Sequence, residues 1–191
     1  MKEKLAKLDK IYTRFETDSK ELTQGRACNK GCSFCCSAAG SIDITTLEGL
    51  RIRRAMEKMP KPRQTTLTKA FRREIKKREA GTEAPCPFLM KNKACMIYEI
   101  RPFSCRRIYS AHVCDTDNPP AVSRKVMDMA ADTIKALQKL DDTGYSGHLS
   151  FILYMLSVPA FFETYMGGDF KPEEIMDFGK SHRIVINCKM G

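Results

Sequence analysis

The chain has 191 residues, of which 42% are hydrophobic, so it is long and apolar enough to bury a core without disulfide bridges. Its formal net charge of +10 and its nine cysteines are the unusual features of a sequence without internal repeats or low-complexity tracts. Disulfide bonds, zinc and iron–sulfur clusters are the three explanations for so many cysteines.

The first ten residues are charged and amphipathic, and they lack the apolar core and cleavage site of a secretory signal. We therefore expect a cytoplasmic protein, and structural disulfides are rare in that compartment. The neighbouring Cys35 and Cys36 also make a poor disulfide pair, because their Cβ atoms diverge. Metal ligation by thiolates is the explanation that we favour.

Hydrophobic residues at helical spacing predict a first helix over residues 3–17. Its apolar face would carry Leu5, Leu8, Ile11, Tyr12 and Phe15.

The first cysteine group, Cys28-x3-Cys32-x2-Cys35-Cys36, follows among turn-forming residues and is predicted to lie on a loop. Two or three intervening residues let the backbone turn and aim two thiolates at one metal. Gly31 can adopt the positive φ that turns backbone N–H groups toward the sulfurs. Adjacent cysteines suit either two different sites or one ligand beside a bystander.

A basic two-helix insert is predicted over residues 45–80. The capping box Thr45-x-x-Glu48 begins one helix, which ends before Pro60, and a second runs from about residue 65 to 80, where Gly81 stops it. Residues 51–78 hold twelve Lys and Arg against two Glu, which equals the whole net charge. The basic residues assigned to the outer face are Arg53, Arg54, Lys58, Arg72, Arg73, Lys76 and Lys77.

Such a face is either a solvated surface or a binding site for an acidic protein or a nucleic acid. The insert lacks the interleaved aromatic residues that stack on bases, which disfavours nucleic acid.

The second cysteine group is Cys86, Cys95, Cys105 and Cys114. His112 is a candidate ligand or hydrogen-bonding neighbour of this group. A metal on four thiolates carries a charge of about −2, and nearby arginines could offset it. Those arginines are Arg101, Arg106 and Arg107. Four apolar residues would either exclude water from the site or belong to the general core, namely Phe34, Phe88, Phe103 and Ile108.

The C-terminal part is helical in pattern. We predict a helix over residues 121–140, then a buried helix pair over 149–166 that Pro159 interrupts, which argues against a membrane span. A short helix from Pro172 and an extended segment over 183–187 follow. Gly144 and Gly147 lie within helical patterns. His148 and His182 are expected to be surface or core residues and not catalysts. Cys188 belongs to neither cysteine group and is expected in the core.

Four segments in order resemble the YkgJ-type cysteine-cluster family, which is also described as a zinc- or iron-chelating domain. They are the first cysteine group, Pro85-Cys86-Pro87-Phe88-Leu89, Cys95-Met96-Ile97-Tyr98, and Arg101-Pro102-Phe103-Ser104-Cys105-Arg106. The resemblance covers residues 25–115. The candidate metal ligands are Cys28, Cys32, Cys35, Cys36, Cys86, Cys95, Cys105 and Cys114.

The family includes the cysteine-rich part of flagellin lysine N-methylases, so the resemblance implies methyl transfer as an alternative activity. The sequence shows no strand followed by a glycine-rich turn of the kind that holds a nucleoside cofactor. No catalytic residues are assigned, because the histidines form no recognisable catalytic set.

We therefore predict a mostly α-helical single domain over residues 1–191, with about six helices and irregular cysteine-rich loops held by metal. Residues 25–115 form the metal-binding core, and 119–191 form a helical scaffold. An iron–sulfur cluster is favoured over zinc, because widely spaced cysteines near prolines are typical of cluster proteins. The role would be in redox chemistry, in metal handling or as an accessory module. The alternative is a structural zinc protein whose basic helices bind an acidic protein or a nucleic acid.

Overall fold

Helices dominate the computed structural model, which describes residues 1–28, 31–38, 41–82, 84–170 and 188–189. Six of the described helices have seven or more residues, which confirms the predicted fold class. The helices are α1 (Lys2–Asp18), α2 (Phe34–Ala38), α3 (Thr46–Glu57), α4 (Lys61–Glu79), α5 (Phe103–Arg106), α6 (Arg124–Leu140), α7 (Leu149–Ser157) and α8 (Pro159–Gly167). Short 3-10 turns lie at Glu21–Thr23 and Tyr98–Ile100.

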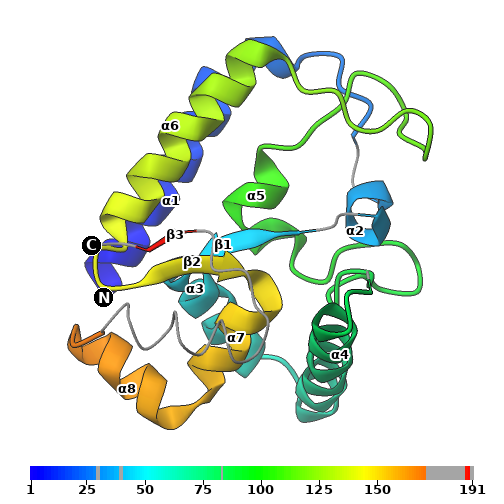
Figure 1. Ribbon diagram of the computed structural model, residues 1–191. Coiled ribbons are helices and arrows are strands. Elements are labelled where there is room, and N and C mark those ends of the chain that lie inside the picture. The colour runs from blue at the N-terminus through cyan, green and yellow to red at the C-terminus, as the bar shows by residue number, and fades with distance from the viewer. Residues whose placement is uncertain (29–30, 39–40, 83, 171–187, 190–191) are drawn as a thin grey trace.

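A small antiparallel sheet lies at the centre of the molecule (Figure 1). β1 (Asp43–Thr45) pairs with β2 (Tyr145–His148), which also pairs with β3 (Cys188–Lys189). The assignment of Gly144 and Gly147 to helical patterns was wrong, since Gly147 lies opposite Ile44 in β2 and Gly144 immediately precedes that strand. Strands this short carry too few residues to show a period of two.

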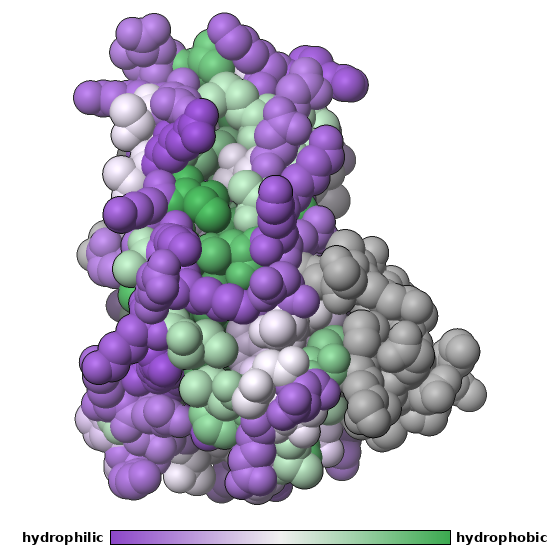
Figure 2. Space-filling model, turned by 90° about the vertical axis from the view of Figure 1, so that its left-hand side faces the viewer, coloured by the Kyte–Doolittle hydropathy of each residue, from purple (hydrophilic) through white to green (hydrophobic). Residues whose placement is uncertain are grey.

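α1 and α6 lie side by side at one edge of the molecule, as Figure 1 shows. Both predicted helices are confirmed, although α6 begins three residues late, because the Ser123 hydroxyl accepts a hydrogen bond from the Val126 N–H and caps it there. Leu8 on α1 and Leu137 on α6 are fully buried. Figure 2 shows a strip of apolar side chains between hydrophilic ones on this side of the molecule.

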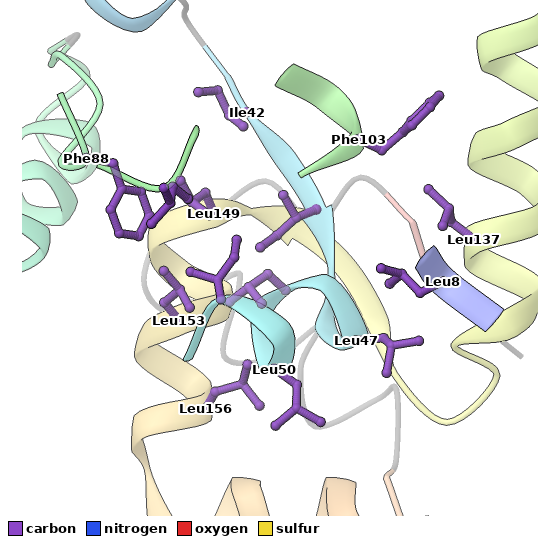
Figure 3. Packing of buried hydrophobic residues seen from close by; sticks show 14 of the residues in the cluster. Leu8, Ile42, Leu47, Leu50, Phe88, Phe103, Leu137, Leu149, Leu153 and Leu156 are labelled. Carbon is purple, nitrogen blue, oxygen red and sulfur yellow. The ribbon is translucent and has the colours of Figure 1, made fainter. Parts of the chain in front are cut away.

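α3 packs closely against α7 beneath the sheet (Figure 3). The predicted capping box is confirmed: the Glu48 N–H donates to the Thr45 hydroxyl, and the Thr45 N–H donates to the Glu48 carboxylate. A Cβ atom at Gly49 would overlap Ile152, so the absence of a side chain lets the two helices approach. Leu50 and Leu156 fill the interface.

The arginines of α3 are not a free basic face, which corrects the assignment of Arg53 and Arg54 to the outer surface. Both are half-buried, and the Arg53 guanidinium lies 3.8 Å from the ring centre of Phe162 and pairs with Glu57. Arg51 pairs with Asp9 at 2.7 Å. These residues hold α3 against α1 and α8.

α4 begins at Lys61, four residues before the predicted start, because Pro62 is well suited to the first turn of a helix. It ends at Glu79, and Gly81 has φ 72°, as a stop at that glycine requires. Leu67 and Phe71 are its buried apolar residues, and the Phe71 ring meets the Phe88 ring edge-on at 5.2 Å.

The predicted buried helix pair over 149–166 is confirmed as α7 and α8. No single described helix is long and apolar enough to cross a membrane, and α7 and α8 reach that length only together, across a bend of 94°. The short helix predicted from Pro172, the extended segment over 183–187 and His182 lie outside the described residues. Cys188 lies in β3.

Candidate metal centre

The first cysteine group does not lie wholly on a loop, because α2 begins within it. Cys35 and Cys36 are in the first turn of α2, where the Cys36 N–H donates to the Ser33 carbonyl at 3.0 Å. Consecutive helical residues point about 100° apart, so these two side chains leave the helix in different directions. Gly31 has φ 102°, which confirms the predicted positive value.

Seven of the eight candidate cysteines line one cavity of about 130 Å³: Cys28, Cys32, Cys35, Cys36, Cys86, Cys95 and Cys105. Cys32 is exposed and the others are half-buried. Apolar side chains form one wall, with Ile42 and Phe88 meeting Leu149. These three residues also belong to the hydrophobic core, as Figure 3 shows, so the cavity lies directly on the core. All eight cysteines are free thiols.

One set of thiols gathers around Cys35. Burial raises the pKa of Cys35 to about 11, with further increases from the thiolate charges of Cys28, Cys114 and Cys32 and of the adjacent Cys36. The pKa of Cys28 is likewise raised, first by burial and then by Cys32 and Cys114. The Ser110 N–H donates to the Cys28 sulfur at 3.2 Å, which brings the segment before Cys114 to this set.

A second set gathers around Cys86. Its N–H donates to the Cys36 carbonyl at 2.8 Å, which joins the end of α2 to the second cysteine group. Burial raises the pKa of Cys86 to about 12, and the charges of Cys36 and Cys95 add to this. Burial also raises the pKa of Cys105 well above its usual value, followed by the charges of Cys86, Cys36 and Cys95.

Grouped by these pKa influences, the eight cysteines form two overlapping sets of four, since Cys36 also acts on Cys35. They adjoin, since the Cys32 charge also raises the pKa of Cys36, after burial and Cys95. The raised pKa values mean that six of the thiols stay protonated at neutral pH, and a bound metal would deprotonate them. These six are Cys28, Cys35, Cys36, Cys86, Cys95 and Cys105.

The chemistry of the donors fits zinc or an iron–sulfur cluster, because both take thiolate ligands. A second observation also fits an anionic metal–thiolate group. Arg107 lines the cavity, and its Nε atom is buried without a hydrogen-bond partner among the described residues. A buried cationic donor of this kind needs an acceptor. Among the described residues, no three His, Cys, Asp or Glu side chains converge closely enough to hold a single metal ion.

The other two arginines of this segment line the same cavity but are tied to the protein. Arg106 pairs with Glu16 at 2.5 Å and donates to the Glu99 carbonyl, while Arg101 lies over the Tyr98 ring at 4.1 Å. The positive charge of Arg101 acts to lower the pKa of Cys95 and Cys105, against the larger effect of burial. The compensation of metal-site charge by these arginines remains a prediction.

His112 does not line the cysteine cavity. Its Nε2 atom lies 3.3 Å and 3.2 Å from the carbonyl oxygens of Asn118 and Pro119, at an exposed position. His148 is buried, as expected of a core residue, and its Nδ1 atom accepts the Ser150 N–H at 3.3 Å to cap α7. Burial lowers the pKa of His148 to about 3, so the imidazole is neutral.

Of the four residues expected to exclude water, two line the cavity, namely Phe88 and Ile108. Phe34 instead lines a shallow groove on the outer side of α2, and Phe103 is buried in the core. The sequence analysis missed Ile42 and Leu149, which come from the start of β1 and of α7. The Leu149 N–H donates to the Ile42 carbonyl at 2.8 Å and joins them at the cavity wall.

Neither β1 nor β2 is followed by a glycine-rich turn. β1 leads directly into α3 at Thr46, and β2 leads directly into α7 at Leu149. A nucleoside cofactor held in the usual way after a strand would need such a turn. These two strands therefore offer no support for the methyl-transfer alternative.

Comparison with known proteins points to the same chemistry. The family model "CxxCxxCC: Putative zinc- or iron-chelating domain" matches residues 27–135, which include all eight candidate ligands and the first two-thirds of α6. No curated protein and no solved structure matches the chain. Since the family model covers more than half of its residues, the chain belongs to the CxxCxxCC family of zinc- or iron-chelating domains.

Proposed function

We propose that the protein binds metal at two adjacent four-thiolate sites. The first would use Cys28, Cys32, Cys35 and Cys114, and the second would use Cys36, Cys86, Cys95 and Cys105. The observation that carries this proposal is that seven of the eight thiols line one cavity. Two hydrogen bonds join the cysteine groups there, from the Cys86 N–H to the Cys36 carbonyl and from the Ser110 N–H, four residues before Cys114, to the Cys28 sulfur. The different directions of the neighbouring Cys35 and Cys36 side chains support the assignment of one to each site.

An iron–sulfur cluster is the occupant that we favour, with zinc as the alternative. A cluster spreads its four cysteines over several iron atoms, whereas tetrahedral zinc needs four sulfurs about 2.3 Å from one point. The wide spacing of Cys86, Cys95 and Cys105 in the sequence, with prolines nearby, supports the cluster. The apolar wall and the buried Arg107 Nε support an anionic group shielded from water. The role we propose is in redox chemistry or metal handling in a reducing cytoplasm.

Anaerobic purification tests the identity of the metal. We expect a coloured protein with broad visible absorption, and iron and acid-labile sulfide in comparable amounts. A colourless protein with two zinc ions per chain would contradict the iron–sulfur cluster but would agree with the proposal of two sites. A protein without bound metal, after expression with iron and zinc supplied, would contradict both.

Single cysteine substitutions test the two-site assignment. Cys32→Ser and Cys105→Ser should each remove about half of the bound metal, because each breaks a different four-thiolate site. The double variant should bind almost none. Cys188→Ser is the matched control, since it removes a cysteine outside both sets, and its metal content should equal that of the wild type. Complete metal loss in either single variant would instead indicate one shared site.

A second candidate function is the binding of a partner through α4. The observation that favours it is the set of exposed basic side chains on this helix: Lys69, Arg72, Arg73, Lys76 and Lys77. None of them has an ion pair with another described residue. An acidic protein or a nucleic acid would supply the missing negative charge.

A further inference from the structure

We propose that the groove between α4 and α7 binds an acidic, amphipathic helix of a partner protein. This inference deepens the second candidate function and rests on it, by naming the face of α4 that is used and the chemistry of the segment that it accepts. It does not depend on which metal the cysteines bind.

One wall of the groove is basic. Lys69, Arg72, Arg73, Lys76 and Lys77 all line it, at spacings of three and four residues along α4. This spacing places them on one side of the helix, over about 12 Å of its length. Glu79 is the single acidic residue among the described residues that line the groove, so its charge is strongly positive.

The floor and opposite wall are apolar. Ile75 of α4 contributes from one side, and Phe151 and Tyr154 of α7 contribute from the other. The Tyr154 side chain is 43% exposed, although it belongs to the most apolar helix of the protein. The groove has a volume of about 810 Å³, which is large enough to hold several side chains of a bound segment.

The basic side chains of α4 make different contacts from those of α3, although the two helices are neighbours in the sequence. The α3 arginines pair with Asp9 and Glu57 and stack on aromatic rings, so they stabilise the fold. On α4, Arg78 pairs with the buried Glu74, on the side of the helix that faces His148 and Cys86. None of the five groove residues pairs with an acid in the part of the chain that the structure describes, so they can bind an external anion.

A protein helix fits this groove better than a nucleic acid does. An amphipathic helix would place acidic residues against the basic wall and apolar residues against Phe151 and Tyr154, so both walls would be used. A phosphate backbone would use the charges alone. A basic stretch of about 12 Å is also short for a nucleic-acid channel, and Tyr154 is a single exposed ring rather than a series for stacking bases.

The position of the groove links the two proposed functions. α4 ends at Glu79, and the chain continues through the groove residue Thr82 to Ala84 and Cys86. A helix bound here would therefore lie beside the segment that leads into the second thiol set. Such a partner is suited to giving metal to the site or receiving it.

Selection from a displayed library of random peptides, each about 15 residues long, tests the proposed chemistry on the purified, metal-loaded full chain. We expect enrichment of peptides with several Asp or Glu residues and with large apolar residues three or four positions apart. Fluorescence anisotropy then measures the affinity of the most enriched peptide at about 150 mM salt, where weak surface attraction is screened. Peptides without that acidic and apolar pattern would overturn the proposal.

Matched variants locate the binding site. The charge reversal Arg72→Glu/Arg73→Glu/Lys76→Glu should weaken peptide binding by about tenfold or more, since it inverts the basic wall. The control Lys61→Glu/Arg63→Glu changes exposed residues of the same helix that do not line the groove, and it should alter affinity by less than about threefold. Tyr154→Ser should weaken binding by about fivefold or more, through loss of the apolar floor.

Equal losses in the groove variant and the control variant would overturn the proposal, and so would an unchanged affinity in the groove variant. A single-stranded DNA of about 20 nucleotides is the competing probe, and tighter binding of DNA than of the peptide would replace the proposed partner by a nucleic acid. Circular dichroism and metal content are measured on every variant. Wild-type metal content with lost peptide binding separates a failure of the docking surface from a failure of the metal sites.

Discussion

Asp141 is a buried carboxylate that joins three helices. It follows the last residue of α6 and is fully buried. Its two oxygens accept hydrogen bonds from the Leu47 N–H in α3, at 2.7 Å, and from the Tyr165 hydroxyl in α8, at 2.8 Å. Burial nevertheless raises the pKa of Asp141 to about 6. Loss of hydration destabilises the charged carboxylate more than the two hydrogen bonds stabilise it.

This raised pKa predicts a specific pH dependence of stability. Between the ordinary aspartate pKa of about 4 and the folded value of about 6, the folded protein binds more protons than the unfolded chain. The contribution of Asp141 to the free energy of unfolding should therefore fall as the pH rises through this range, by on the order of 2–3 kcal/mol. Asp141→Asn should lack this decrease, which urea unfolding between about pH 4 and pH 7 would measure. Parallel curves for the two proteins would contradict the prediction.

The sequence could not reveal the role of Asp141. Its partners are 94 and 24 residues away, and nothing in its local pattern distinguishes it from the neighbouring Asp142. The cysteines were different, because their spacing is itself the chemical information. The sequence alone named all eight as candidates, and seven of them line one cavity. The proposed split into two sets depends on contacts such as that of Cys86 with Cys36, which the sequence does not show.

At the scale of elements, the long amphipathic helices were predictable and the short strands were not. α1, α3 and α6 carry repeated apolar residues, so a local pattern was enough to find them, and the capping box of α3 also gave its start. β1 has three residues, and its pairing with β2 joins Asp43 to His148, about 100 residues later in the chain. The same long-range pairing brings Ile42 and Leu149 to the cavity wall, which explains why the sequence analysis missed them.

The contact of α3 with α7 makes Gly49 a sensitive position. Gly→Ala inside a helix ordinarily stabilises it by about 1 kcal/mol. At Gly49 the new Cβ would overlap Ile152, and it would lie 2.9 Å from the Leu156 side chain. Gly49→Ala should therefore destabilise the protein by about 1–3 kcal/mol, as measured by chemical denaturation.

A double-mutant cycle provides the control for this prediction. Ile152→Ala removes the side chain that the new Cβ would overlap, at its own cost of about 2–5 kcal/mol. Adding Gly49→Ala to that variant should cost at least about 1 kcal/mol less than adding it to the wild type. Additive effects would show that the cost at Gly49 has another origin.

At the scale of the whole molecule, different interactions stabilise the helical core and the segments that carry the cysteines. α1, α3, α6 and α7 pack against one another through buried apolar residues. The segments around the cysteines carry only short helices and turns, and their thiols are partly exposed. If metal occupies both sites, its binding free energy is also folding free energy for these segments.

Removal of the metal should therefore act unevenly on the protein. We expect a chelator under reducing conditions to lower the free energy of unfolding by about 3–4 kcal/mol. This is the stabilisation that a ligand gives when its free concentration is several hundred times its Kd. Amide hydrogen exchange should rise in residues 27–38 and 84–115, while the central amides of α3 and α7 stay protected. A uniform rise over the whole chain, or none at all, would contradict this division.

The contact of Leu149 with Ile42 also sets the order of events during synthesis. Cys28 leaves the ribosome about 120 residues before Leu149, and the wall of the cavity is incomplete until Leu149 arrives. At about 5–20 residues per second, this interval lasts roughly 6–24 s. The eight thiols are added one after another during this interval, ending with Cys114, and all of them lack the cover of Leu149, so we expect the nascent chain to be susceptible to oxidation and to mismetallation until Leu149 arrives. Rapid translation of residues 28–149 is thus a way to protect this protein.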